Sequence, residues 1–224
     1  MFARIALCLF LTVLSVVVWA QQFGPATFPI KDDDGDPISN HALGAGEMKQ
    51  VAGLPGLVDV SGKGDVTLYQ FYDFNCPFCR EAAADVDELT RTDQALRLVF
   101  VPYPVLSVQS VAGARVELAL RELGTPKQFL EFHRKIYAGR GIIDGDRALA
   151  VAQAMGFDRQ KIIDAANAQR VTATMTAHAK LGTALKLMAT PAYVIAGVAI
   201  LGHPGLEPLR KVVASVRRCN AAVC

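Results

Sequence analysis

The strongest constraint on the fold is a change of hydrophobic period in the middle of the chain. Residues 66–74 form an apolar run rich in aromatic and β-branched side chains, which is typical of a buried strand. Two cysteines follow directly, in Cys76-Pro77-Phe78-Cys79. The next apolar residues have the spacing of one helix face: Ala82, Val86 and Leu89. We therefore predict a strand that passes into a helix, with Cys76 at the junction and Pro77 in the first helical turn, where its missing N–H costs nothing.

This position gives Cys76 a chemical role. The unpaired N–H groups and the positive end of the helix dipole favour an anion at a helix start, so the pKa of Cys76 should be lowered. Cys79, one turn inside, would be shielded and could resolve a mixed disulfide by attacking Cys76. The alternative is a structural disulfide or half of a zinc site, but the remaining pair, Cys219 and Cys224, is distant and loosely spaced for zinc. We interpret Cys76 and Cys79 as a catalytic redox pair.

Residues 1–20 have the features of a signal peptide. Arg4 supplies the positive start, residues 5–18 the apolar stretch, and residues 18–20 a cleavage site of small-residue type. An uncleaved membrane anchor is the alternative. Cys8 lies within the apolar stretch and would be removed, which leaves four cysteines, an even number suited to an oxidising compartment. We expect export to the periplasm.

Residues 21–60 are predicted to be an irregular N-terminal arm, because prolines and glycines interrupt every period, with a short edge strand expected within residues 51–60. The acidic cluster at residues 32–36 lacks the distal glutamate of a calcium loop and is interpreted as a solvated turn. The formal net charge is +2, without a basic patch, so the sequence gives no indication of nucleic-acid or anionic-membrane binding.

Residues 61–218 are predicted to form one α/β domain. A second apolar strand at 96–103 follows the first helix, and strand, helix and strand in succession imply a parallel pair with a right-handed crossover. Helical periodicity then dominates residues 105–188. Two apolar runs meeting at Gly197 predict a hairpin, and a final helix follows from Gly205.

This order of elements resembles the thioredoxin fold, with Cys-Pro-Phe-Cys opening the first helix and Thr190-Pro191 opening the hairpin. The large helical insertion narrows the resemblance to the DsbA-like branch, over residues 60–218. The segments 71–76 and 129–133 look most like bacterial periplasmic proteins of the ScsC and Com1 kind.

The resemblance implies a cis bond between Thr190 and Pro191 that lies against the Cys76 sulfur. The backbone of Thr190 would then be free to pair with an extended substrate. Pro77, Phe78, Phe74 and the apolar surface near Pro191 would complete the substrate-binding site.

Two departures from the family pattern concern the redox chemistry. Gln70 stands where relatives commonly carry a buried glutamate that moves the proton of the second cysteine, and glutamine cannot titrate. Phe78 stands where strong oxidases carry histidine, so the thiolate should be less stabilised and the disulfide less oxidising. Thr190 before the proline is more typical of isomerase-like members. We therefore expect a protein other than a strong oxidase.

The tail, residues 219–224, begins and ends with cysteine. A small terminal disulfide between Cys219 and Cys224 is the expected state in an oxidising compartment. The alternative is a pair of exposed thiols that passes electrons to Cys76 and Cys79 or binds copper, and Arg217 beside Cys219 could lower its pKa.

The sequence thus predicts an exported thiol–disulfide oxidoreductase without cofactor or metal, acting as oxidase or as isomerase and reductase. Its partners would be cysteine-containing exported proteins and a membrane redox protein that resets the pair. The arm does not resemble a helical dimerisation stalk, which favours a monomer. The alternative function is a copper or zinc carrier, or a chaperone, that uses the same groove without turnover.

Overall fold

The computed structural model describes residues 27–60 and 64–224. The predicted signal peptide, residues 1–20, lies outside the described residues. In the part of the chain that the structure describes, no helix is both long and apolar enough to cross a membrane.

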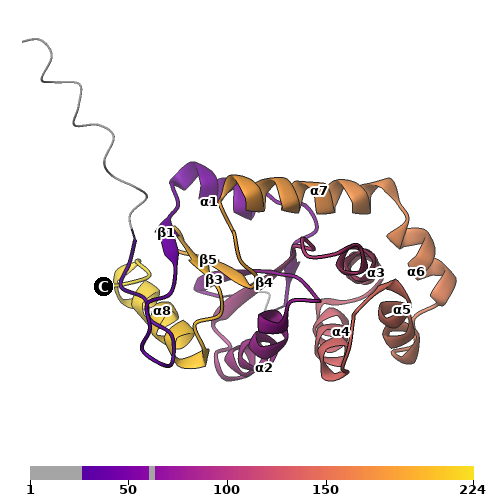
Figure 1. The fold of residues 1–224 in the computed structure, drawn as a ribbon, viewed down its shortest axis with the longest axis horizontal. Helices are drawn as coiled ribbons and strands as arrows, with labels where there is room; N and C mark the ends of the chain where they lie inside the picture. Colours follow the sequence, from indigo (N-terminus) through magenta and orange to yellow (C-terminus); the bar gives the residue numbers. More distant parts are fainter. Residues whose placement is uncertain (1–26, 61–63) are drawn as a thin grey trace, which may run out of the picture.

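In the described residues, six strands form one mixed sheet in the order β1-β6-β5-β3-β4-β2 (Figure 1). The strands are β1 (Asn40–Ala42), β2 (Val58–Asp59), β3 (Val66–Tyr72), β4 (Leu96–Pro102), β5 (Ala192–Ile195) and β6 (Val198–Leu201). Strands β3 and β4 are parallel, as predicted for the strand–helix–strand unit, and β5 pairs antiparallel with β3 and β6. The predicted hairpin is therefore the β5–β6 pair.

Helices cover both faces of this sheet, and further helices lie beside it. They are α1 (Ala45–Ala52), α2 (Pro77–Thr92), α3 (Val108–Leu123), α4 (Pro126–Ala138), α5 (Gly145–Ala154), α6 (Arg159–Ala166), α7 (Gln169–Ala184) and α8 (Leu206–Cys219). Figure 1 shows α1 and α7 above the sheet, α2 and α8 below it, and α3 to α6 beside it. The helices α3 to α7 are the predicted insertion between β4 and β5, so the α/β architecture with a helical insertion is confirmed.

Two apolar layers hold the sheet between these helices. On the α2 and α8 side, Leu68, Tyr72 and Tyr193 pack with the inner faces of α2, α4 and α8. On the opposite side, Phe71 and Val99 pack with residues of α7 and α1. Because both faces are covered, β3 and β4 are apolar almost throughout, which is why their sequence is a continuous hydrophobic run.

The N-terminal segment is more regular than the sequence predicts. Residues 40–42 form edge strand β1 on β6, residues 45–52 form α1, and residues 58–59 form β2 on β4. The expectation of an irregular arm is therefore wrong for residues 40–42 and 45–52, because prolines and glycines mark the turns between short elements that gain their stability from the sheet. The edge strand expected within residues 51–60 is β2. The acidic cluster is an exposed turn, in which Asp32 Oδ1 accepts hydrogen bonds from two backbone N–H groups.

Candidate active site

Cys76 occupies the N-cap of α2, with Pro77 at the first helical position. The chain leaves β3 at Tyr72 and reaches the helix through a short turn in which the N–H of Cys76 donates to the carbonyl of Asp73. Cys76 is 5% exposed and Cys79, on the inner face of α2, is 1% exposed. The predicted junction of strand and helix at Cys76 is confirmed, and both cysteines are free thiols.

The two sulfurs differ strongly in acidity. The pKa of Cys76 is lowered to about 6, and the largest cause is a hydrogen bond from Cys79. Hydrogen bonds from Thr190 and from the backbone N–H groups of the first helical turn lower the pKa further, whereas burial raises it. Burial raises the pKa of Cys79 well above that of an ordinary thiol, and the hydrogen bond to Cys76 raises it further. At neutral pH Cys76 is therefore a thiolate nucleophile, while Cys79 stays protonated.

A segment far along the chain faces the Cys76 sulfur. The Thr190–Pro191 bond is cis, as the resemblance implies. Sγ of Cys76 lies 2.9 Å from the carbonyl oxygen of Thr190, so a protonated Cys76 donates to it. Thr190 itself is 8% exposed and precedes β5 directly. The structure thus brings Cys76, Cys79, Thr190 and Pro191 together.

Asp73 holds the turn before Cys76 in place, and sequence reasoning missed it. Its carboxylate is buried and accepts hydrogen bonds from the backbone N–H groups of Val105 and Leu106 and from the hydroxyl of Ser110. Asn75 in the same turn bonds the backbone of Ile143 through its side chain. The signal in the sequence was an aspartate and an asparagine interrupting an apolar run, a pattern that binds nearby backbone groups.

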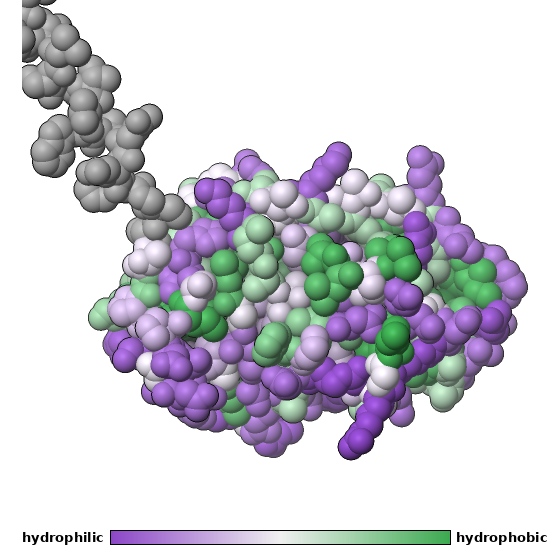
Figure 2. All heavy atoms as spheres, viewed as in Figure 1, coloured by the Kyte–Doolittle hydropathy of each residue, from purple (hydrophilic) through white to green (hydrophobic). Residues whose placement is uncertain are grey.

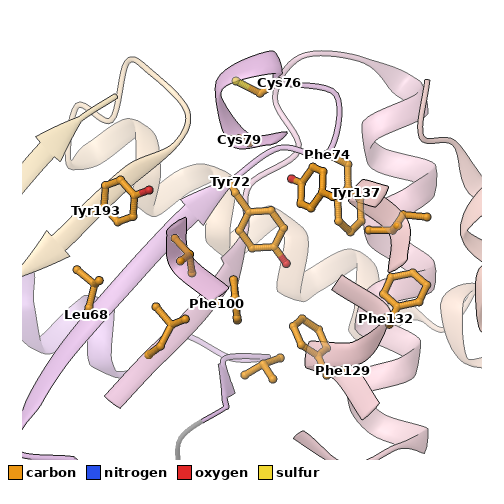
Figure 3. Close-up of a cluster of buried hydrophobic side chains, with 14 of the residues drawn as sticks. Leu68, Tyr72, Phe74, Cys76, Cys79, Phe100, Phe129, Phe132, Tyr137 and Tyr193 are labelled. Carbon is orange, nitrogen blue, oxygen red and sulfur yellow. The ribbon is translucent and has the colours of Figure 1, made fainter. Parts of the chain in front are cut away.

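Phe74 does not contribute to a docking surface, and that expectation is wrong. It is 2% exposed because its ring packs edge-on against the rings of Tyr72, Phe132 and Tyr137 (Figure 3). The turn after β3 directs this side chain inward, which a run of apolar residues cannot reveal. Phe78, by contrast, is 61% exposed.

Exposed apolar side chains come from the segments that meet at Cys76. Val105 and Leu106 are anchored by Asp73, Ile142 adjoins the residue that binds Asn75, and Met188 precedes Thr190 by two positions. We call the set the apolar rim: Phe78, Val105, Leu106, Val108, Ile142 and Met188. Figure 2 shows apolar side chains across the middle of the drawn face, between α7 and the ends of α2 and α4, with a hydrophilic lower edge.

Polar side chains also lie beneath the cysteines. Gln70 is 1% exposed, and its Oε1 is buried without a hydrogen-bond partner. Glu117 is fully buried, accepts from the Tyr72 hydroxyl at 2.6 Å and lies 3.2 Å from Nδ1 of His133. Burial raises the pKa of Glu117 against the opposing effects of His133 and Tyr72.

The terminal cysteines form a disulfide, Cys219–Cys224, as the first of the two interpretations of the tail expects. The bond closes a short loop at the end of α8 and keeps Ala222 buried against the core. Among the described residues, no three side chains of the His, Cys, Asp and Glu types come together as a possible metal site.

A dithiol at a helix start, facing a cis-proline on an α/β sheet, defines the class of thioredoxin-fold redox proteins. The family model of the DSBA-like thioredoxin domain matches residues 67–214. The chain therefore belongs to the DSBA-like thioredoxin family of thiol–disulfide oxidoreductases. No curated protein sequence matches it.

Solved structures agree with this assignment. A thioredoxin-like oxidoreductase from Silicibacter pomeroyi DSS-3 is 28% identical, with a TM-score of 0.71 over 76% of this chain and 98% of that one. The catalytic domain of Proteus mirabilis ScsC is 18% identical, with a TM-score of 0.67 over 76% and 94%. A periplasmic thioredoxin-like protein from Salmonella enterica serovar Typhimurium is 21% identical, with a TM-score of 0.64 over 77% of this chain and 97% of that one.

Proposed function

We propose that this protein is an exported thiol–disulfide oxidoreductase that exchanges disulfides with cysteines of other exported proteins, with Cys76 as nucleophile and Cys79 as resolving thiol. The observation that carries the proposal is the difference in acidity between two adjacent thiols. Cys76 has a pKa of about 6 at the start of α2, whereas the pKa of buried Cys79 is raised. Only one of the two is therefore ready to attack a substrate.

The chemistry follows from this asymmetry. The thiolate of Cys76 attacks a substrate disulfide, forms a mixed disulfide and releases one substrate thiolate. Cys79 loses its proton and attacks the Cys76 sulfur, which releases the second substrate thiolate and leaves Cys76 and Cys79 joined. The reverse sequence oxidises a substrate dithiol. Two electrons move between the cysteine pairs in either direction, so no cofactor is required.

Substrate binding in this proposal uses the backbone beside Pro191 and the apolar rim. An extended peptide can pair with the main chain of Thr190, whose carbonyl already lies 2.9 Å from the nucleophilic sulfur. Unfolded or misfolded proteins expose apolar side chains near their cysteines, and Phe78 and Leu106 offer matching surface. Pro77 between the cysteines has no backbone N–H and a fixed φ that suits the first turn of α2.

The acidity of Cys76 supports a role other than strong oxidation. A pKa of about 6 lies between the values of about 7 for thioredoxin and about 3.5 for the strong oxidase DsbA. A less stabilised thiolate makes the disulfide less oxidising. Together with Phe78 between the cysteines, this favours isomerase or reductase activity.

Export to the periplasm and a membrane redox partner are part of the same proposal. The features of residues 1–20 and the internal Cys219–Cys224 disulfide support an oxidising compartment. An isomerase or reductase must be kept reduced there, so we propose that a membrane protein supplies the electrons to the Cys76–Cys79 disulfide.

Turnover with insulin and with scrambled ribonuclease tests the proposal. Cys76→Ala should abolish both activities. In a glutathione buffer the wild-type protein should reduce the substrate and form the Cys76–Cys79 disulfide in doing so. Unaltered turnover of Cys76→Ala would refute the enzyme proposal. Stoichiometric metal on the purified reduced protein would instead favour the carrier function. Equilibration with glutathione then gives the potential, and a value near that of DsbA, about −120 mV, would contradict the isomerase or reductase role.

A further inference from the structure

A row of hydrogen-bonded side chains connects the buried core beneath the cysteines to the surface. The hydroxyl of Tyr193, on β5, lies 2.8 Å from Nδ1 of His203, which follows β6. Nε2 of the same imidazole lies 3.0 Å from a carboxylate oxygen of Asp85, on α2. Exposure rises along the row: Tyr193 is 0% exposed, the His203 side chain 12% and the Asp85 side chain 36%.

The chemistry of the two ends sets the direction of the hydrogen bonds. An ionised carboxylate can only accept, so Nε2 of His203 carries the hydrogen that Asp85 accepts. In the neutral imidazole Nδ1 is then an acceptor, and the Tyr193 hydroxyl donates to it. The imidazole can take up a second hydrogen at Nδ1, and the Asp85 carboxylate would stabilise the resulting cation.

The inner end of the row lies in the buried cluster that contains Cys79. Tyr193 is directly opposite Gln70 in the antiparallel β3–β5 pair. Tyr193 and Cys79 belong to one buried cluster, and Figure 3 shows the Tyr193 hydroxyl directed into that cluster. Burial, and after it the charge of Cys79, raises the pKa of Tyr193, which is consistent with their proximity.

Cys79 needs such a route because it is 1% exposed and must lose or gain a proton in every cycle. Gln70, which is also buried, cannot titrate. We propose that Tyr193, His203 and Asp85 form the path by which the proton of the Cys79 thiol reaches solvent during resolution of the mixed disulfide. This inference rests on the proposed function and assigns a proton-transfer role to residues outside the cysteine motif.

The Cys79 proton passes to the Tyr193 oxygen while the Tyr193 proton passes to Nδ1 of His203, so the phenol is never ionised. The Cys79 sulfur bonds to the Cys76 sulfur, the bond between Cys76 and the substrate breaks, and the substrate leaves as a thiolate. His203 then gives up one proton to water at the exposed Asp85 end. In the opposite direction the same row delivers a proton to Cys79.

A second buried row, Tyr72–Glu117–His133, is the competing route. The charge of Cys79 is a minor contributor to the raised pKa of Tyr72, which burial and Glu117 dominate. Glu117 is 0% exposed and His133 4%, so this row ends less exposed than Asp85, although His133 lines a cavity together with Arg80 and Arg134. It therefore suits a structural role between α3 and α4 better than proton transfer.

Few other charges lie on the elements around His203. Asp33 of the N-terminal segment is bonded through its backbone N–H to Pro204, next in the chain, and its carboxylate lies against Gly205. On α8, Glu207 and Arg210 form an ion pair with each other. Asp85 is therefore the carboxylate positioned to hold the protonated imidazole.

The two-step reaction of the reduced full chain with dithiobis(nitrobenzoate) tests the path. With Cys8, Cys219 and Cys224 all replaced by serine as background, Cys76 attacks the reagent and releases one nitrothiophenolate, and Cys79 then expels the second. Tyr193→Phe should slow the second release about tenfold or more, because a general acid–base contribution is lost, and leave the first unchanged. Tyr137→Phe is the matched control, since that buried hydroxyl donates only to the backbone carbonyl of Asp73, and its second release should equal that of wild type.

His203→Ala provides a second, independent variant. It should slow the same release, and added imidazole should restore the rate, a recovery that a purely structural role would not produce. Second-release rates within about twofold of wild type for both Tyr193→Phe and His203→Ala would overturn the path. A loss of the second-release rate in Tyr72→Phe alone would also overturn the path.

Failure of the proposed function has a different signature. In that case wild-type protein would lack a fast first release at neutral pH, or Cys79→Ser would still release two equivalents. Melting temperatures of all variants confirm that the proteins compared are folded.

Discussion

The acidity of Cys76 depends on its partner cysteine, and substitutions at Cys79 test that dependence. The hydrogen bond from Cys79 is the largest of the effects that lower the pKa of Cys76 to about 6. At this pKa about nine-tenths of Cys76 is thiolate at neutral pH. Cys79→Ala removes the donor. A hydrogen bond to a charged group is worth about 1.5–3 kcal/mol, and one pKa unit corresponds to about 1.4 kcal/mol, so the pKa of Cys76 should rise to about 7–8.

The rate of alkylation of Cys76 by iodoacetamide, measured against pH in a background with Cys8, Cys219 and Cys224 replaced by serine, gives this pKa. Cys79→Ser is the matched control, because its hydroxyl can still donate and should leave the midpoint close to that of wild type. A wild-type midpoint above about pH 8 would refute the reasoning. Equal midpoints for Cys79→Ala and Cys79→Ser would show that the hydrogen bond is not the cause.

The same thiolate links stability to pH. Because folding lowers the pKa of Cys76 from 9.0 to about 6, the thiolate stabilises the reduced protein fully above pH 9, and this contribution is lost as the pH falls to about 6. The difference in free energy of unfolding between the reduced protein and Cys76→Ser should therefore grow between about pH 6 and pH 9. A difference that stays constant over this range would contradict the lowered pKa.

Three further perturbations test other parts of the structure. Leu106→Ser in the apolar rim should raise KM for scrambled ribonuclease several-fold without slowing the reaction with a small disulfide, whereas Leu123→Ser, at the far end of α3, should change neither. Cys224→Ser opens the terminal loop and should cost about 2 kcal/mol of stability in denaturant unfolding, from the entropy of closing so short a loop; an unchanged midpoint would contradict this. Gln70→Glu in the Tyr193→Phe background should restore part of the lost second release, because it places a titratable acid opposite position 193; no recovery would show that a base there cannot reach Cys79.

Local features of the sequence were sufficient to predict the residues at the centre of the site. The continuous apolar run before Cys76 and the helical spacing after it located the junction of strand and helix, and the helix start implied the low pKa. Thr190-Pro191 before an apolar run, combined with the cysteine motif, was sufficient to place the cis-proline through the family resemblance. These features are local because backbone hydrogen bonding and helix dipoles act within a few residues.

Only the tertiary structure decided which side chains surround that centre. Phe74 and Phe78 are both aromatic neighbours of Cys76, yet the turn after β3 buries the first and the helix exposes the second. Tyr193 and His203 meet Asp85, more than a hundred positions earlier, because β5 pairs with β3 while α2 packs across the same face. Such contacts depend on strand order and on the packing of whole elements. A sequence records the period of each element, but not which elements become neighbours.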